Sequence, residues 1–155
     1  VSGIADVSGS PVIADGTVYA TGVSGLTIAV DLSSGERRWQ REIGGASTPV
    51  VSGDAVFIVD LDGRMVAMRR SDGAILWTRE LPRPRRKRDD AWSGPVLAGG
   101  ALWAVSNDGR LAAVDPATGE LRSDRDIGGA GFVSPVVADG RMIVVSDAGE
   151  ITALR

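Results

Sequence analysis

Short apolar stretches alternate along the chain with polar turns, and none of them repeats with the period of a helix. Val12–Ile13, Thr17–Ala20 and Leu26–Val30 are three such stretches, rich in β-branched residues and separated by turns that contain Gly, Asp or Ser. Runs of this kind are typical of short strands joined by hairpins. A fourth stretch, Glu36–Arg41, contains Trp39. The pattern therefore predicts a unit of four antiparallel strands.

The same unit occurs four times. Prolines followed by valine lie 38, 46 and 40 residues apart, at Pro11, Pro49, Pro95 and Pro135. Glycines deeper in the unit repeat these spacings, at Gly25, Gly63, Gly109 and Gly149. A lone meander cannot cover both of its faces, whereas a radial stack of such repeats can. The sequence therefore predicts an all-β protein, a β-propeller of four-stranded antiparallel blades, with blades at about 1–47, 48–93, 94–133 and 134–155.

The two ends of the chain occupy defined positions in this repeat. Val1 stands ten residues before Pro11, as Trp39 does before Pro49, so we expect it in the outer strand of a preceding blade. The last unit stops after its third strand, at Ile151–Arg155, and so lacks its outer strand. Two architectures fit: a four-blade ring closed by residues 1 to 5, or half of a larger propeller. The start at Val1 favours a processed or excised chain.

The composition narrows the possible chemistry. The 155 residues contain no His and no Cys, which excludes Ser-His-Asp triads, imidazole metal ligands and thiolate sites. The only lysine is Lys87, so there is no P-loop signature. The formal net charge of −3 does not favour nucleic-acid binding, and no apolar run is long enough to span a membrane. We expect no catalytic residue, no cofactor and no metal.

Two tryptophans at one position of the unit are candidates for packing between blades. Trp39 and Trp77 each follow a turn glycine by four residues, and a repeated aromatic of this kind usually packs between blades. Ser123 takes this position in the third unit, so we expect that blade to be held more loosely. The run Asp60–Gly63 is similar to the start of a calcium loop, but no distal glutamate follows. We interpret it as a turn.

A basic segment interrupts the connection between the second and third units. Trp77 precedes Pro95 by 18 residues, whereas Trp39 precedes Pro49 by 10, so about eight residues are inserted here. The insertion carries five cations: Arg83, Arg85, Arg86, Lys87 and Arg88. It is either a solvated surface loop or an electrostatic contact with anionic lipid or an acidic partner. The neighbouring Asp89 and Asp90 are poorly placed to act as an acid and a base.

The unit resembles the PQQ-type propeller repeat. Ser134–Gly140 reads Ser-Pro-Val-Val-Ala-Asp-Gly, and Gly25–Trp39 carries the family phrase Gly-x-x-x-Ala-x-Asp-x-x-x-Gly with its closing tryptophan. The whole chain is similar to the C-terminal half of the BamB family, lipoproteins of the outer-membrane β-barrel assembly machinery. Residues 5–8 before the first Ser-Pro, the phrase Trp92–Leu97 and the end after a third strand carry this likeness.

The resemblance implies an eight-bladed propeller whose absent N-terminal half supplies the lipid anchor and the closing outer strand. It implies a non-enzymatic scaffold at the periplasmic face of the bacterial outer membrane, docked on the periplasmic POTRA domains of BamA. A partner-facing loop of the family reads Asp-Val-Asp just before a Thr-Pro or Ser-Pro. Asp6 matches its first acid, whereas Ser8 replaces the second, which weakens charge-assisted binding at this loop.

Two other functions stay open from the sequence. The first is a fragment of a quinoprotein dehydrogenase, an enzyme that holds its quinone over a calcium ion, a base carboxylate and a stacked tryptophan. No acid-rich cluster outside the turns supplies such a site here. The second is a free-standing four-blade module that binds a peptide or a glycan on the face of its ring.

Overall fold

A computed structural model of the chain describes residues 8–82, 91–128, 133–146 and 149–154. Within these ranges the chain forms fifteen strands and no helix, and the strands build four separate antiparallel sheets. Three sheets have four strands each, and the last has three. The all-β fold and the four-stranded antiparallel unit predicted from the repeat are therefore confirmed.

Each sheet is a meander in which the strands pair in chain order. The first sheet contains β1 (Val12–Ala14), β2 (Thr17–Gly22), β3 (Leu26–Asp31) and β4 (Arg37–Arg41). The second contains β5 (Val50–Ser52), β6 (Ala55–Val59), β7 (Arg64–Arg69) and β8 (Ile75–Glu80). The third contains β9 (Trp92–Ala98), β10 (Ala101–Ser106), β11 (Arg110–Val114) and β12 (Leu121–Asp126). The fourth contains β13 (Val136–Ala138), β14 (Arg141–Val145) and β15 (Ile151–Leu154).

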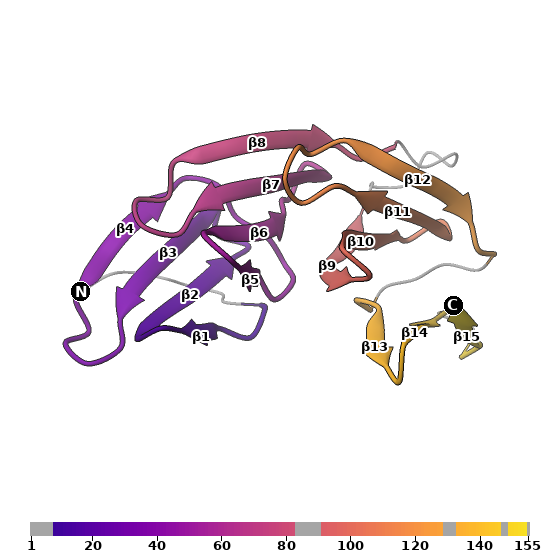
Figure 1. Cartoon of the computed structure of the whole chain (residues 1–155), viewed down its shortest axis with the longest axis horizontal. Coiled ribbons are helices and arrows are strands. Elements are labelled where there is room, and N and C mark those ends of the chain that lie inside the picture. The colour runs from indigo at the N-terminus through magenta and orange to yellow at the C-terminus, as the bar shows by residue number, and fades with distance from the viewer. Residues whose placement is uncertain (1–7, 83–90, 129–132, 147–148, 155) are drawn as a thin grey trace.

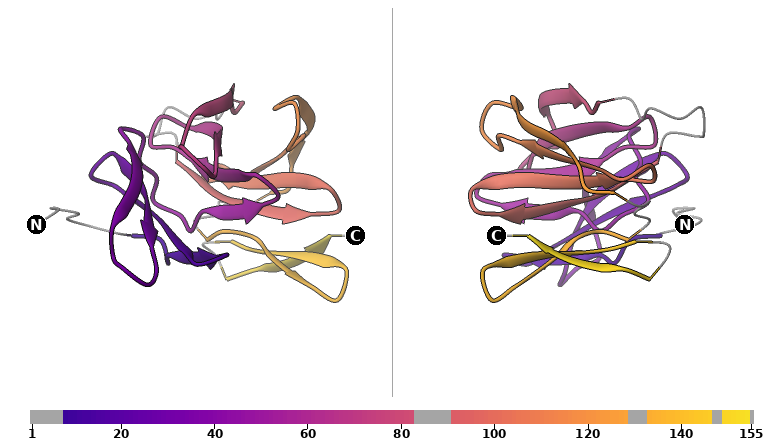
Figure 2. Two further views of the ribbon diagram at one scale, coloured as in Figure 1. Left: turned by 60° about the vertical axis from the view of Figure 1, so that its left-hand side comes forward. Right: turned by 90° about the vertical axis from the view of Figure 1, so that its right-hand side faces the viewer.

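The sheets follow one another in chain order along an arc (Figure 1, Figure 2). The first strand of each sheet lies on the inner side of the arc, and β8 and β12 lie on its outer side (Figure 1). The third sheet begins at Trp92, two residues before the blade boundary expected at 94. Within the described ranges, no strand pairing joins one sheet to another, so contacts made by side chains hold neighbouring sheets together.

Tight hairpins join the first two strands of each sheet. Asp15 and Gly16 connect β1 to β2 with φ angles of 45° and 70°. Positive φ at both central residues defines the type I′ turn, whose twist matches that of the flanking strands. Gly99–Gly100 and Asp139–Gly140 repeat this geometry in the third and fourth sheets. The Asp-Gly and Gly-Gly pairs in the sequence therefore set the register of the strands that follow them.

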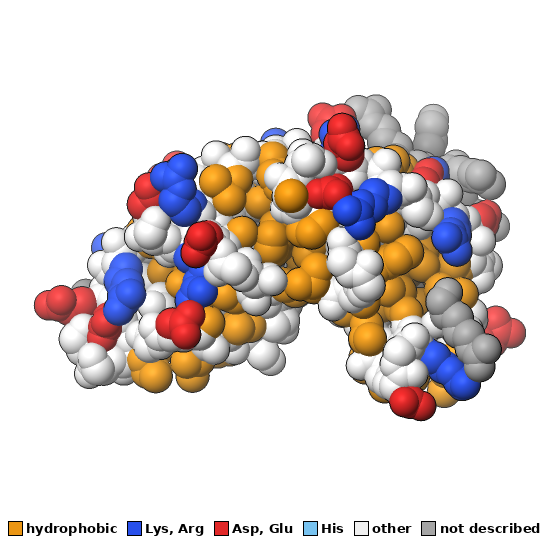
Figure 3. Space-filling view, in the orientation of Figure 1, with side chains coloured by type: hydrophobic (Ala, Val, Ile, Leu, Met, Phe, Trp, Pro, Cys, Tyr) orange, Lys and Arg blue, Asp and Glu red, His pale blue; other side chains and the backbone are white. Residues whose placement is uncertain are grey.

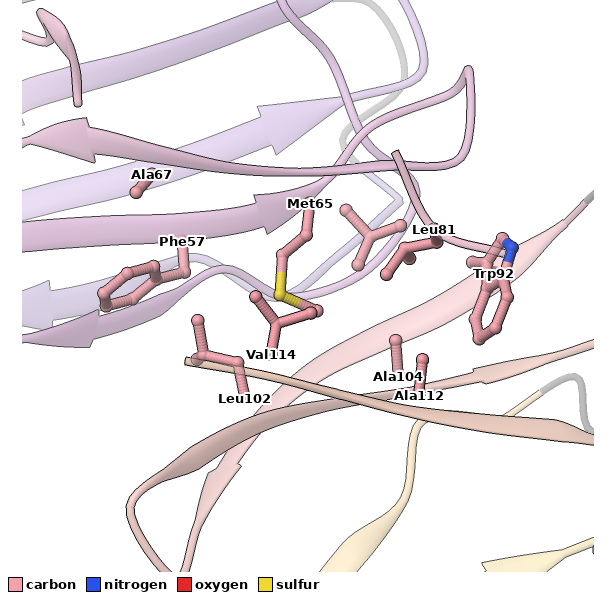
Figure 4. Close-up of a cluster of buried hydrophobic side chains, with 10 residues drawn as sticks. Phe57, Met65, Ala67, Leu81, Trp92, Leu102, Ala104, Ala112 and Val114 are labelled. Carbon is pink, nitrogen blue, oxygen red and sulfur yellow. The ribbon is translucent and has the colours of Figure 1, made fainter. Parts of the chain in front are cut away.

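A large hydrophobic cluster lies between the second and third sheets. Phe57 and Met65 of the second sheet pack with Leu102 and Val114 of the third, and all four are at most 3% exposed (Figure 4). Leu81 and Trp92 pack against the same cluster. Burying side chains of this size stabilises a fold by about 1.5–3 kcal/mol each. The arc is thus held by apolar contacts between sheets that share no hydrogen-bonded edge.

One row of residues crosses each of the first two sheets in the same way. In the first sheet Tyr19 pairs with Ala29, and Ala29 pairs with Trp39. In the second sheet Phe57, Ala67 and Trp77 form the equivalent row. Because the central alanine is small, the two rings contact each other above it, with centroids 6.0 Å and 5.9 Å apart. Each row therefore presents a tryptophan in a fixed position.

The tryptophan of each complete row lies against a glycine of the next sheet. The indole of Trp39 donates a hydrogen bond to the Arg70 carbonyl, 2.7 Å away. A Cβ atom on Gly73 would lie only 2.7 Å from the Trp39 ring. Arg41 adds a hydrogen bond of 2.7 Å from its Nε to the Gly73 carbonyl. The glycine is thus required both by its φ of 71° and by the ring above it.

The contact recurs between the second and third sheets. Trp77 donates to the Pro116 carbonyl at 3.1 Å, and Arg79 donates to the Gly119 carbonyl. A Cβ atom on Gly119 would lie 2.7 Å from the Trp77 ring. In the third sheet the row is Trp103, Ala113 and Ser123, so no indole extends toward the fourth sheet from this position.

Replacing Gly73 by alanine tests the contact between tryptophan and glycine. The new methyl group would enter the Trp39 ring, and we expect a loss of about 3 kcal/mol from backbone strain and overpacking together. Gly35→Ala is the matched control, because Gly35 has nearly the same φ, 72°, and nothing within 4 Å of its Cβ position. It should lose about 1 kcal/mol. Urea unfolding measures both, and equal losses would contradict the role given to the ring.

Candidate functional site

The outer strands of the first three sheets differ at two equivalent positions. Two residues before the tryptophan position stand Arg37 in β4, Ile75 in β8 and Leu121 in β12. One residue before it stand Arg38, Leu76 and Arg122. Charged side chains on an edge strand discourage pairing with another chain. Only β8 lacks a charge at both positions, among the three complete outer strands that the structure describes.

The apolar residues of β8 are open to solvent. The exposed fractions are 53% for Ile75 and 46% for Leu76. β8 ends the order of its sheet, so its outer edge has no strand partner among the described residues. Figure 3 shows further hydrophobic side chains in the middle of one face of the arc, over the second and third sheets. An edge strand whose first two residues are apolar and exposed can receive a partner polypeptide.

A groove lies between the first and second sheets, and an arginine bridges it. Arg70 of the second sheet donates to the carboxylate of Asp15 at 2.8 Å and to the hydroxyl of Tyr19 at 3.3 Å. These two partners, the Tyr19 hydroxyl first, raise the pKa of Arg70. The guanidinium also lies 5.8 Å from the centroid of the Tyr19 ring. The groove has a volume of about 440 Å³, and the ion pair of Arg70 with Asp15 spans it.

Carboxylates organise the turns that precede the outer strands. The Oδ1 atom of Asp31 accepts hydrogen bonds from the backbone N–H of Ser33 and Ser34, both at 3.0 Å. Its Oδ2 atom accepts 2.6 Å away from Arg38. The Arg38 side chain and the Ser33 hydroxyl, followed by these backbone donors, lower the pKa of Asp31 far below its usual range. Asp115 makes the same turn in the third sheet, and its pKa is lowered chiefly by the N–H groups of Thr118 and Ala117.

The second sheet builds this turn with the charges exchanged. Arg69 stands at the position of Asp31 and Asp115, and it pairs with Asp72 at 2.9 Å. Asp72 accepts a hydrogen bond from the Ala74 N–H, which is the largest cause of its lowered pKa. The carboxylates of all three turns are therefore used by the turns themselves.

The Asp60–Gly63 run is also occupied by its own turn. The carboxylate of Asp60 is almost wholly buried and accepts from the N–H groups of Asp62 and Arg64 and from the Arg64 side chain. The pKa of Arg64 is raised, mainly by this hydrogen bond with Asp60. No group of three or more acidic side chains suited to a metal ion occurs in the part of the chain that the structure describes.

The residues predicted to bind a partner lie near or beyond the limits of the described ranges. Ser8 is exposed at the start of the first range. Asp6 and the cations Arg83, Arg85, Arg86, Lys87 and Arg88 lie outside the described residues, as do Asp89 and Asp90. Trp39 is buried between two sheets, and Trp77 is partly buried in the equivalent place. None of the described segments is a helix that could cross a membrane.

Two features of this surface were not recognised from the sequence. An alignment of the outer strands shows Ile75 and Leu76 at the positions that Arg37 and Arg38 occupy in the first unit. The loss of these two charges from an edge strand is therefore visible in the sequence. The bridge from Arg70 to Asp15 joins residues 55 positions apart. No spacing rule in the sequence points to it, because only the packing of two blades brings them together.

Comparison with known proteins places the chain in a described family. The family model for outer membrane protein assembly factor BamB matches residues 1–79 and 87–155. The gap in this match, at residues 80–86, overlaps the basic insertion. Among curated proteins no sequence matches the chain.

Solved structures show the same fold. BamB from Moraxella catarrhalis superposes with a TM-score of 0.82 at 24% identity, over 95% of this chain and 44% of the other. The computationally designed Ika4 protein superposes at 0.80 with 14% identity, over 98% of this chain and 92% of its own. Quinohemoprotein alcohol dehydrogenase from Comamonas testosteroni superposes with a TM-score of 0.77 at 17% identity, over 89% of this chain and 28% of the enzyme. The chain thus spans less than half the length of the BamB structure.

The turn carboxylates predict how stability depends on pH. A carboxylate whose pKa is lowered by folding stabilises the fold above its unfolded pKa of about 3.9, and this contribution is lost as the pH falls through the folded pKa. We expect the free energy of unfolding of the unmodified chain to decrease below about pH 4. In Asp31→Asn the decrease should be smaller, since one contributing carboxylate is gone.

Asp54→Asn is the control for this prediction. It removes the same charge from an exposed side chain that forms no hydrogen bond or ion pair within the described ranges. Denaturant titrations between pH 2 and 7 would compare the three proteins. An unchanged pH dependence in Asp31→Asn would contradict the role of the turn.

Proposed function

The chain belongs to the family of the outer membrane protein assembly factor BamB, and on that premise we propose that it is a non-enzymatic scaffold that docks on the periplasmic POTRA domains of BamA. It forms half of an eight-bladed propeller and acts at the periplasmic face of the bacterial outer membrane. The family match over most of the chain and the propeller fold support this proposal.

The observation that carries the docking proposal is the apolar edge of β8. Ile75 and Leu76 replace the arginines that β4 carries at the same positions, and about half of each side chain is exposed. An edge strand that begins with two uncharged, apolar residues offers both backbone hydrogen-bonding groups and apolar side chains to a partner strand. We therefore place the contact with BamA at β8.

The N-terminal half of the propeller is the second proposed partner. The fourth sheet has three strands, and β15 ends its order without an outer neighbour. Ile151 of this strand is 72% exposed. A strand from the N-terminal half, which would also carry the lipid anchor, would pair with β15 and complete the sheet. The 44% coverage of the BamB structure is consistent with one half of such a ring.

Two further contacts belong to the proposal. Asp6 and Ser8 would face the partner at the loop before the first blade, with Ser8 supplying a hydroxyl in place of an acid. Arg83, Arg85, Arg86, Lys87 and Arg88 would attract an acidic partner surface or anionic lipid.

Replacing these five cations by serine should weaken partner binding and reduce its salt dependence. Unchanged affinity and salt dependence would identify the segment as a solvated loop.

The dehydrogenase alternative rests on the likeness to the Comamonas enzyme, which at 17% identity shows the fold alone. Adding PQQ with calcium tests it, since a quinone spectrum or dye reduction would support an enzyme.

A free-standing four-blade module is the other alternative, and the match over nearly the whole Ika4 chain favours it. Light scattering distinguishes it, since a stable monomer supports a self-contained module.

A double substitution in β8 tests the docking proposal. Ile75→Arg with Leu76→Arg gives β8 the charges of β4, and we expect it to weaken binding to purified POTRA domains at least about tenfold, as loss of an apolar contact of about 1.4 kcal/mol would. Pull-down and titration would use the full-length protein, with the 155-residue chain beside it. Both side chains are exposed, so the unfolding midpoint should not change.

Leu121→Arg is the matched control, because Leu121 occupies the position of Ile75 in the next outer strand and is 40% exposed. It should leave the affinity for the POTRA domains unchanged. Equal weakening by both variants would show a nonspecific effect of charge, and unchanged binding by the double variant would remove β8 from the interface.

A further inference from the structure

A second groove lies between the third and fourth sheets, at the place that corresponds to the groove between the first and second. Trp103 lines it where Tyr19 lines the other, since each stands eight residues after the first proline of its unit. Its volume is about 380 Å³. The groove between the first and second sheets has about 440 Å³, although the second sheet has all four of its strands. A fourth strand in a sheet therefore does not by itself close the groove beside that sheet.

The two grooves differ in what the following sheet places into them. Arg70 enters the first groove and pairs with Asp15 and Tyr19. In the third sheet Pro116 takes the position of Arg70, and its carbonyl accepts from Trp77. Among the described residues, the lining of the groove beside Trp103 contains no acidic residue that could pair with an arginine as Asp15 does in the first groove.

The walls of the open groove are apolar. Five apolar side chains from five strands line it: Trp103, Leu111, Val137, Met142 and Leu154. The indole N–H of Trp103 already donates to the Ala98 carbonyl at 3.0 Å, so this ring offers the groove only its apolar face. A large apolar side chain would therefore lose little hydrogen bonding on entering.

The charge of the open groove is positive. Gly99 and Gly140 stand at the hairpin positions where the first groove has Asp15 and Asp54. Arg125 and Arg141 are the charged residues of its lining. Arg125 donates to the Ser123 hydroxyl at 3.1 Å, and neither guanidinium forms an ion pair within the described ranges. Asp139 precedes Gly140 in the turn but does not line the groove.

We propose that this groove binds a short segment of a partner polypeptide in which a carboxylate adjoins a large apolar side chain. The side chain packs on Trp103 and Met142, and the carboxylate binds Arg125 and Arg141, whose planar guanidinium groups suit carboxylate geometry. The volume fits one such side chain with its carboxylate. This site uses other residues than the β8 edge, so either can fail without the other.

Titration of the full-length protein with short peptides tests the site. The first probe is an acetylated, amidated Gly-Phe-Asp-Gly peptide, and the second is Gly-Gly-Phe with a free carboxyl terminus. Gly-Gly-Phe amide lacks the carboxylate, and Gly-Ala-Asp-Gly lacks the large side chain. We expect binding of the first two, observed as a change in tryptophan fluorescence and in NMR shifts, with at least about tenfold weaker binding of the others. Tighter binding of the Gly-Phe-Asp-Gly peptide would show that the groove takes a side-chain carboxylate. Tighter binding of Gly-Gly-Phe would show that it takes the carboxyl terminus of a chain.

The variants decide whether the groove is responsible. Arg125→Gln with Arg141→Gln should weaken the carboxylate peptides at least about tenfold. Arg37→Gln, which changes an exposed arginine on β4, should leave them unchanged. Val137→Trp should block the groove by filling it, which separates loss of charge from loss of space. Three results would each overturn the proposal. They are unchanged affinity in the double variant, no peptide binding at millimolar concentration, and binding of the fatty acid laurate without binding of any of the peptides.

Discussion

The structure depends on the contact of a tryptophan with a glycine of the following sheet. The four sheets share no hydrogen-bonded edge, so their relative positions rest on side-chain packing. Trp39 and Trp77 are held by an aromatic partner in their own sheet and lie on Gly73 and Gly119 of the next. Because a Cβ atom on either glycine would enter the ring, the contact requires glycine on the side of the following sheet. Each indole thus packs directly on the backbone of the next sheet, from the first sheet to the second and from the second to the third.

Grooves between neighbouring sheets leave space for function. One lies between the first and second sheets, which the contact of Trp39 joins, and another lies between the third and fourth sheets, where Ser123 stands at the tryptophan position. The protein uses the two grooves in different ways. Arg70 bridges one groove to Asp15, whereas glycines replace the acids in the groove beside Trp103. The scaffold thus keeps its geometry while the chemistry of each groove varies by a few side chains.

The repeat made the fold predictable from the sequence. The spacing of the prolines and turn glycines predicted antiparallel four-stranded units, because each landmark has a local cause in a turn or a strand start. The edge of β8 could also have been read, since Ile75-Leu76 aligns with Arg37-Arg38. The pairing of Arg70 with Asp15 and the charge of the groove beside Trp103 could not. Both arise where two units meet, and no single unit contains the residues that make them.

The row of Trp103, Ala113 and Ser123 has a consequence for how the arc comes apart. Contacts between sheets link only neighbours, so the free energy of the array is close to a sum of unit and nearest-neighbour energies. Ser123 stands where the tryptophan contact would begin, so we expect the coupling between neighbours to be weakest there. The fourth sheet should then open by itself while the first three remain folded, as a separate cooperative unit with faster amide hydrogen exchange.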